Sequence, residues 1–180
     1  HWENTSTIRK ILNSITFYIA RHSDAVIATG TKSAQAQMSI GVNKDKIFTS
    51  EGLAPDFYEE VLNEIGFLIT TRTGQAEYRE RPSLTRFFQN GMLATFDSYL
   101  NQFYVRHWQD LQKDAEISRG LKFSEGTYLF YLRHENQFVS YDAAYGPMED
   151  FAKSFSAFIL QDKPLGNEIW EQKIRFFYEF

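Results

Sequence analysis

The stretch that decides the fold reads Val139-Ser140-Tyr141-Asp142-Ala143-Ala144-Tyr145-Gly146-Pro147-Met148-Glu149-Asp150-Phe151-Ala152-Lys153-Ser154-Phe155-Ser156-Ala157-Phe158-Ile159-Leu160. Pro147 suits the first turn of a helix, where its missing N–H and fixed φ do no harm. Two acidic residues follow in that turn, where negative charge meets the positive end of the helix dipole. Apolar residues then recur at spacings of three and four. We therefore predict an amphipathic helix from Pro147, with Glu149 at its start as a cap, a solvated carboxylate or a metal ligand.

The composition of the 180 residues indicates one folded domain, or one domain joined to a fragment. Hydrophobic residues make up 43% of the chain and aromatic residues 17%, which is ample for an apolar core. The net charge is −4 and the basic residues are scattered, so we predict no nucleic-acid binding. The absence of cysteine excludes disulfides and thiolate metal sites. The longest mostly apolar run, Ile11–Ala20, is about half as long as a membrane span, so we predict none.

Helices and strands are expected to alternate in the first fifty residues. Thr7–Arg21 has the apolar spacing of an amphipathic helix, and Asp24–Gly30 reads as a short buried strand. Thr31 is expected to cap a helix that ends at Gly41, and Lys46–Thr49 to form a second strand. This helix–strand–helix–strand order is typical of an α/β unit.

Three short runs in this part are His22-Ser23-Asp24-Ala25-Val26-Ile27-Ala28-Thr29-Gly30-Thr31, Ile40-Gly41-Val42 and Lys46-Ile47. Together they resemble the end of the N-terminal Rossmann domain of glycogen-synthase-like retaining glycosyltransferases. In that family the nucleotide-sugar site lies mainly in a second Rossmann domain, which nothing in this chain matches. The resemblance implies a short α/β, Rossmann-like fragment over residues 1–52; a generic βα unit explains the same residues.

From residue 53 onward the sequence predicts mainly helices with aromatic faces. The polar run Thr70–Ser83 is expected to be a loop. Tyr128–Leu132 fits either a strand or a buried helical turn, and its periodicity does not decide between them. We therefore predict a mainly α fold for residues 53–180. Its helices are expected to begin at or near Pro55, Phe87, Thr95, Pro147 and Asn167.

Most of this helical part carries a second resemblance. The matching stretches are Glu60–Phe67, Ser98–Trp108, Val139–Phe155 and the tail Gln172–Phe180. They resemble the catalytic domain of the anthrax-lethal-factor-like zinc metallopeptidases. The resemblance implies a helical, gluzincin-like metallopeptidase domain over residues 53–180, preceded by the short α/β segment. It also implies protein or peptide as the ancestral substrate.

The family's chemistry depends on a His-Glu-x-x-His motif on a helix. The two His side chains lie one turn apart and bind zinc, and the Glu is the general base toward the metal-bound water. A Glu that opens a later helix is the third ligand, and the resemblance assigns that position to Glu149. An acidic residue one turn later supports the ligands, and a Tyr seven residues before the third ligand stabilises the oxyanion.

The zinc motif itself is degenerate in this chain. Asn63 and Phe67 stand at the two His positions, and only Glu64 keeps its residue type, as a vestigial general base. Asn is a poor zinc ligand and Phe is none, so the resemblance implies that zinc is lost and that no other cofactor replaces it. Glu149 then remains as a vestigial ligand.

The supporting residues depart from the family pattern as well. Lys153 replaces the acidic residue one turn after Glu149, with which we expect it to pair. Asp142 stands at the Tyr position, and Tyr141 beside it is a substitute oxyanion partner. We predict a metallopeptidase-like domain without peptidase activity, in a binding or structural role with protein or peptide as partner.

Other readings of the chain remain open. A fragment of a nucleotide-sugar-dependent glycosyltransferase is the main alternative, and the abrupt change near Ser50–Leu53 also suits a fusion of two unrelated parts. The start at His1 predicts a fragment or a processed product. The pair His134-Glu135 begins like a zinc motif, but Phe138 takes its partner position. His107 is expected to be a surface or core histidine rather than a ligand.

Overall fold

The computed structural model describes residues 12–19, 26–30, 36–42, 48–50, 52–71, 74–120 and 123–179. Within these ranges the protein is mainly helical with three small sheets, as predicted at the level of fold class. No helix in the described part of the chain is both long and apolar enough to cross a membrane. The helices are α3 (Pro55–Thr71), α4 (Tyr99–His107), α5 (Gln112–Arg119), α6 (Phe123–Arg133), α7 (Pro147–Leu160) and α8 (Ile169–Phe176).

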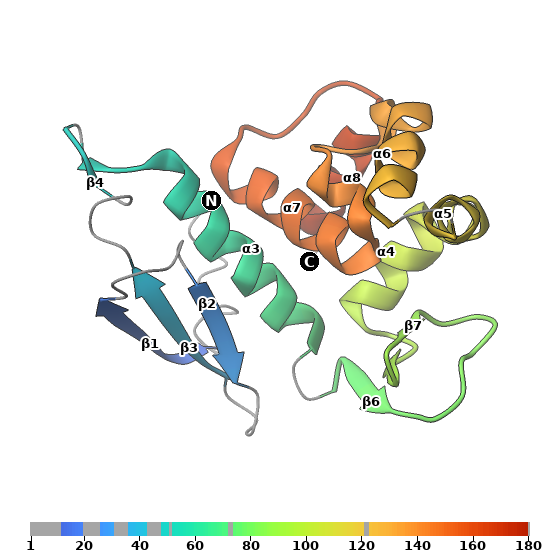
Figure 1. Cartoon of the computed structure of the whole chain (residues 1–180), viewed down its shortest axis with the longest axis horizontal. Helices are drawn as coiled ribbons and strands as arrows, with labels where there is room; N and C mark the ends of the chain where they lie inside the picture. Colours follow the sequence, from blue (N-terminus) through green and yellow to red (C-terminus); the bar gives the residue numbers. More distant parts are fainter. Residues whose placement is uncertain are drawn as a thin grey trace.

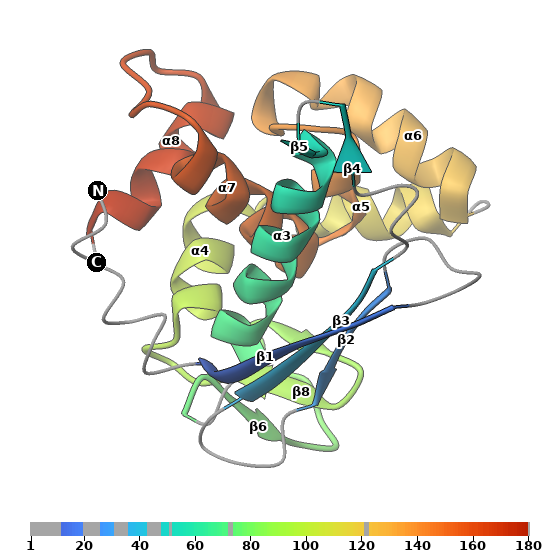
Figure 2. The same ribbon diagram turned by 90° about the vertical axis from the view of Figure 1, so that its left-hand side faces the viewer.

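Helix α3 separates the N-terminal sheet from the other helices (Figure 1). That sheet has the strand order β1-β3-β2. Strand β1 (Leu12–Ile19) pairs in parallel with β3 (Ala36–Val42), whereas β2 (Val26–Gly30) pairs with β3 in the antiparallel sense. Strand β2 contacts α3, and Figure 2 shows the sheet lying beside that helix.

Both helices predicted in the first fifty residues are wrong where the structure describes them. Residues 12–19, in the middle of the first predicted helix, form β1, and residues 36–42, at the end of the second, form β3. The run Ile15-Thr16-Phe17-Tyr18-Ile19 consists of β-branched and aromatic residues, which favour a pleated strand over a helix. The described residues therefore do not show the predicted helix–strand alternation.

The two strands predicted in this part are confirmed over their described residues. Val26–Gly30 forms β2, and Phe48–Thr49 forms β4, which pairs with β5 (Gly52–Leu53). The other residues of these predictions, 24–25 and 46–47, lie outside the described ranges, as do residues 7–11, 20–21 and 31–35 of the two predicted helices.

A β-hairpin occupies the place of the short helix predicted near Phe87. Strands β7 (Phe88–Gln89) and β8 (Met92–Ala94) pair around Asn90 and Gly91, whose φ values are +52° and +79°. Asn-Gly is the preferred pair for a tight hairpin turn, so this turn overrides the apolar spacing. Strand β6 (Ala76–Tyr78) pairs with the other edge of β8, inside the segment predicted to be a loop.

Helices α3 and α7 share one apolar core, as predicted. Both begin at the predicted prolines, and they contact each other along their length. A Cβ built on Gly66 would lie 2.8 Å from the Cα of Ala152, so the two backbones approach as closely as a glycine allows. The core residues from the two helices include Ile65, Leu68, Phe151 and Phe155, with Val61 and Phe158 partly buried against them.

The remaining helices were predicted with mixed success. Helix α4 begins later than predicted because Ser98 caps it: the Ser98 hydroxyl accepts the Asn101 N–H at 3.2 Å, and the helix ends at His107. The segment Tyr128–Leu132 is helical, within α6. Helix α8 begins near the predicted position with a capping box between Glu168 and Glu171. Helix α5 was not predicted.

Three short 3₁₀ turns complete the helical part that the structure describes. They are η2 (Glu135–Gln137), η3 (Asp142–Tyr145) and η4 (Phe177–Glu179).

Candidate functional site

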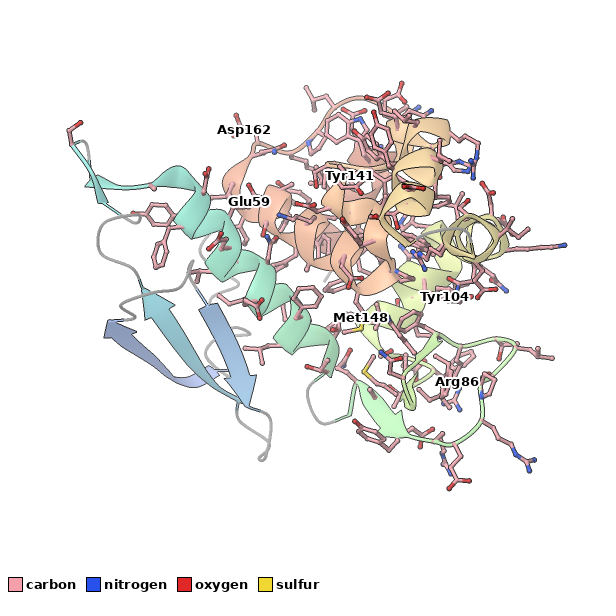
Figure 3. The ribbon with its side chains drawn as sticks, viewed as in Figure 1. Glu59, Arg86, Tyr104, Tyr141, Met148 and Asp162 are labelled. Carbon is pink, nitrogen blue, oxygen red and sulfur yellow. The ribbon has the colours of Figure 1, made fainter. Side chains whose placement is uncertain are left out.

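The candidate site lies where α3 faces α7, and we call it the α3–α7 seam. Asn63 of α3 lies against Ser156 of α7, and Gly66 lies against Ala152, so residue numbers rise along one helix as they fall along the other. The two helices are therefore antiparallel. Figure 3 labels Glu59 on the side of α3 that faces α7. The seam comprises Glu59, Asn63 and Gly66 of α3 with Ala152, Lys153 and Ser156 of α7.

Lys153 places a positive charge in the seam. Its Nζ donates to Glu59 Oε1 at 2.7 Å and lies 3.9 Å from Asp142 Oδ2. The Lys153 side chain is 20% exposed, so these ion pairs are partly shielded from water. The predicted pairing of Lys153 with Glu149 is wrong. Lys153 instead pairs with Glu59, which lies across the seam on α3, and it lies near Asp142 of η3, which precedes α7.

Asn63 is engaged by α7 rather than open to solvent. Its side chain is only 9% exposed, and its Oδ1 accepts the Ser156 hydroxyl at 2.6 Å. The same hydroxyl lies 3.3 Å from the carbonyl oxygen of Glu59. Sequence reasoning missed both Ser156 and Glu59, although Glu59 stands one helical turn before Asn63 and therefore on the same side of α3.

Glu149 belongs to the same side of α7 as Ala152 and Lys153, but its carboxylate turns back toward the start of the helix. A Cβ built on Gly146 would lie 2.7 Å from Glu149 Oε2, so the carboxylate lies directly against the residue that precedes the helix. That oxygen is buried, and no described residue hydrogen-bonds to it. Burial raises the pKa of Glu149, against the opposing effects of its own backbone N–H and of the Arg119 guanidinium.

Glu64 and Phe67 are both half-buried on α3. Burial, and then the neighbouring charge of Glu60, raise the pKa of Glu64. Glu149 is not among the charges that act on Glu64. The structure thus joins Asn63, Lys153 and Asp142 through Glu59 and Ser156, and no hydrogen bond or ion pair described in the structure joins Glu64 to Glu149.

Tyr141 lies in a group of aromatic side chains beside α7 (Figure 3). Its hydroxyl accepts that of Tyr145 at 3.3 Å, and its ring centroid lies 6.1 Å from that of Tyr128 and 5.6 Å from that of Tyr131. The contact with Tyr145 and partial burial raise the pKa of Tyr141 to about 12. Tyr141 therefore keeps its proton at neutral pH and can donate a hydrogen bond.

The side chains at the expected zinc positions do not make a zinc donor set. The Asn63 oxygen is bound to Ser156, Phe67 has no donor atom, and the Lys153 ammonium repels a cation. Within the described ranges, no group of three or more His, Asp or Glu side chains is placed to hold a metal ion. His134, the other zinc-like position, instead hydrogen-bonds to Asp114 through Nε2 at 2.7 Å.

A fully buried charged network lies on another side of α7, and sequence reasoning missed it. Asp150 Oδ2 accepts Lys173 Nζ at 2.5 Å and Trp108 Nε1 at 2.7 Å, and all three side chains are inaccessible to water. Lys173 also donates to the Gln137 carbonyl oxygen at 2.7 Å. The available signal was the position of Lys173 on the apolar side of α8, four residues after Ile169 and three before Phe176.

Comparisons of the chain with protein-family models, with curated proteins and with solved structures found no match.

Proposed function

We propose that residues 53–180 form a metallopeptidase-like domain that has lost zinc and peptide hydrolysis and keeps a binding or structural role. Its partner is a protein or a peptide. The observation that carries the proposal is the antiparallel pairing of α3 with α7, in which Asn63 contacts Ser156 and Gly66 contacts Ala152. A zinc motif on α3 and a third ligand at the start of α7 require this kind of helix pair.

The spacing along each helix supports this pairing. Phe67 follows Asn63 by one turn and so belongs to the same side of α3. Glu149 precedes Ala152 and Lys153 by three and four residues and so belongs to the side of α7 that faces α3. Because Gly66 lies against Ala152, Glu149 lies within about one helical turn of Phe67 when the two positions are compared along the axes of the helix pair.

The charges in the seam support loss of the metal. Two carboxylates, Glu59 and Asp142, flank the Lys153 ammonium, so the seam contains a cation of its own. The Lys153 ammonium compensates the negative charge of these carboxylates without needing ligands. Unlike zinc, it does not polarise a substrate carbonyl or activate a water molecule. The seam then holds α3 against α7, and the domain acts through its surface.

Zinc titration of a rebuilt motif tests the proposal. The parent protein should bind no stoichiometric zinc and cleave no peptide. The double variant Asn63→His with Phe67→His should bind zinc in calorimetry, and zinc should raise its Tm because a ligand of the native state stabilises it. The matched control is Asn63→His with Phe67→Leu, which supplies only one imidazole. If the folded double variant binds zinc no better than this control, the alignment with the zinc motif is wrong.

A fragment of a nucleotide-sugar-dependent glycosyltransferase is the alternative function. This alternative depends on helices and strands alternating in the first fifty residues. The described segments β1 and β3 are strands where that order requires helices. No observation in the structure favours it. Saturable binding of a uridine- or adenosine-diphosphate sugar in calorimetry would nevertheless place it ahead of the metallopeptidase-like domain.

A further inference from the structure

Four tyrosine rings meet at the surface where α6 contacts η3. Tyr128 and Tyr131 belong to α6, Tyr145 belongs to η3, and Tyr141 directly precedes η3. The ring centroid of Tyr145 lies 5.3 Å from that of Tyr141, which also contacts the two rings of α6. Tyr128 is 53% exposed, and the other three side chains are half-buried. We call these four residues the tyrosine cluster; Figure 3 labels Tyr141, which contacts the other three.

The exposed side of α6 extends this aromatic surface. Leu129 and Leu132 are exposed, as Tyr128 is. Leu132 follows the other two by three and four residues, so the three side chains share one side of the helix. Single exposed apolar residues are ordinary, but a contiguous group of large ones is typical of a surface that binds a partner.

The angles between the rings select the kind of partner. The Tyr141 ring plane makes angles of 69°, 83° and 67° with those of Tyr128, Tyr131 and Tyr145. Rings at such angles form ridges with notches between them, whereas a nucleobase stacks on a flat ring face. A proline-rich chain in the polyproline II conformation docks into aromatic-lined grooves, so the notched cluster matches it.

The Tyr141 hydroxyl adds a hydrogen-bond donor to the cluster. It accepts the Tyr145 hydroxyl at 3.3 Å, which leaves its own proton for another acceptor. The raised pKa of Tyr141, about 12, keeps that proton in place at neutral pH. The carbonyl groups of a polyproline II chain have no partner within the chain, whereas most of those of a helix do. The donor therefore favours a polyproline II segment over a helical one.

Carboxylates lie at this surface as well. The exposed Asp142 lies 3.9 Å from the Lys153 ammonium, which is closer to Glu59, at 2.7 Å. Two carboxylates around one ammonium leave one negative charge. Glu125 lies one turn before the exposed apolar residues of α6, and Arg133 at the end of that helix is paired with a carboxylate of α5 at 3.0 Å. The surface is therefore negative and matches a basic residue in the partner.

We propose that the tyrosine cluster and the exposed apolar side of α6 bind a proline-rich peptide segment that carries a basic residue. Proline rings occupy the notches, the Tyr141 hydroxyl donates to a main-chain carbonyl, and the basic side chain lies near Asp142. The inference rests on the proposed function, because it takes from it a peptide as partner. Zinc titration reports on the α3–α7 seam and peptide titration on this surface, so the two can fail separately.

Calorimetric titration of the full chain with a short polyproline peptide that ends in one arginine tests the site. The peptide should bind saturably, and the same peptide with every second proline replaced by glycine should bind more weakly, because it must lose more conformational entropy. Tyr128→Ala should weaken binding about tenfold. The matched control is Tyr78→Ala, which removes an 87%-exposed tyrosine from β6, far from α6 (Figure 1), and should leave binding unchanged.

Two further variants separate the donor and the charge from the rings. Tyr141→Phe keeps the ring and should weaken binding about fivefold through the lost hydrogen bond. Asp142→Asn should weaken binding at low salt and have little effect at high salt. Circular dichroism confirms that each variant is folded. Absence of saturable binding, or an equal loss in Tyr78→Ala, would overturn the proposal. An alanine-rich helical peptide with the same arginine that binds as tightly would overturn the assignment to a proline-rich partner.

Discussion

Asp150 and Lys173 form an ion pair at 2.5 Å in a place where neither side chain is exposed to solvent. Burial raises the pKa of Asp150 and lowers that of Lys173, and their mutual attraction opposes both changes. Trp108 and Ser154 also donate to the Asp150 carboxylate, at 2.7 Å and 3.3 Å. The pair therefore ties α7 to α8 and α4 in the centre of the helical part.

Removing one member of this pair should be strongly destabilising. Lys173→Met leaves the Asp150 carboxylate buried without a cation and should lower the free energy of unfolding by about 3–5 kcal/mol. The double variant Asp150→Asn with Lys173→Met buries no charge and should lose less than the sum of the two single changes. Urea unfolding of the four proteins measures the difference. Additive losses would show that the two side chains do not interact.

Phe155 should contribute much more to stability than Ile159, its neighbour on the same helix. Phe155 is 6% exposed and packs against Phe177, with ring centroids 5.6 Å apart, whereas Ile159 is 38% exposed. Phe155→Ala should cost about 3–5 kcal/mol through lost burial and the cavity. Ile159→Ala should cost below about 1 kcal/mol. Equal melting temperatures for the two variants would contradict this placement of α7.

His107 should make the protein less stable in mild acid. In the folded state its pKa is about 4, whereas in the unfolded chain it is near 6.5. The unfolded state therefore binds the proton first, and the stabilisation present above pH 6.5 is lost as the pH falls toward 4, by at most about 3 kcal/mol. Other groups titrate in this range, so the comparison is with His107→Phe, which should lose less stability between pH 7 and 5 than the parent. An identical loss in both proteins would remove His107 as a cause.

The sequence was sufficient for the helices whose local signals agree. For α3 and α7, a proline at the first turn and an apolar period of three to four point to the same structure. For β1 and the β7–β8 hairpin, apolar spacing suggested helices. Strands form instead, because Ile15–Ile19 consists of β-branched and aromatic residues and because Asn90-Gly91 favours a tight hairpin turn. Periodicity alone was misleading there because the segments are short.

The candidate site was less predictable because its contacts join distant parts of the chain. Asn63 and Ser156 are 93 residues apart in sequence, and the Lys153 contact to Glu59 spans 94. A pattern within one helix places Lys153 and Glu149 on one side of α7, but it does not show that Lys153 reaches across to Glu59. The apolar side of α8 includes Lys173, but a lysine is rarely buried without a charged partner, and only the fold brings Asp150 to it.

The most direct test of the central claim is whether Glu149 serves as the third ligand of a rebuilt zinc site. Zinc affinity should be measured in the variant Asn63→His with Phe67→His, and again after the further change Glu149→Gln. If α3 and α7 preserve the geometry of a metallopeptidase site, the Glu149→Gln change should weaken zinc binding by about 100-fold, because a carboxylate ligand is lost. Equal zinc affinity with and without the Glu149 carboxylate would contradict the account.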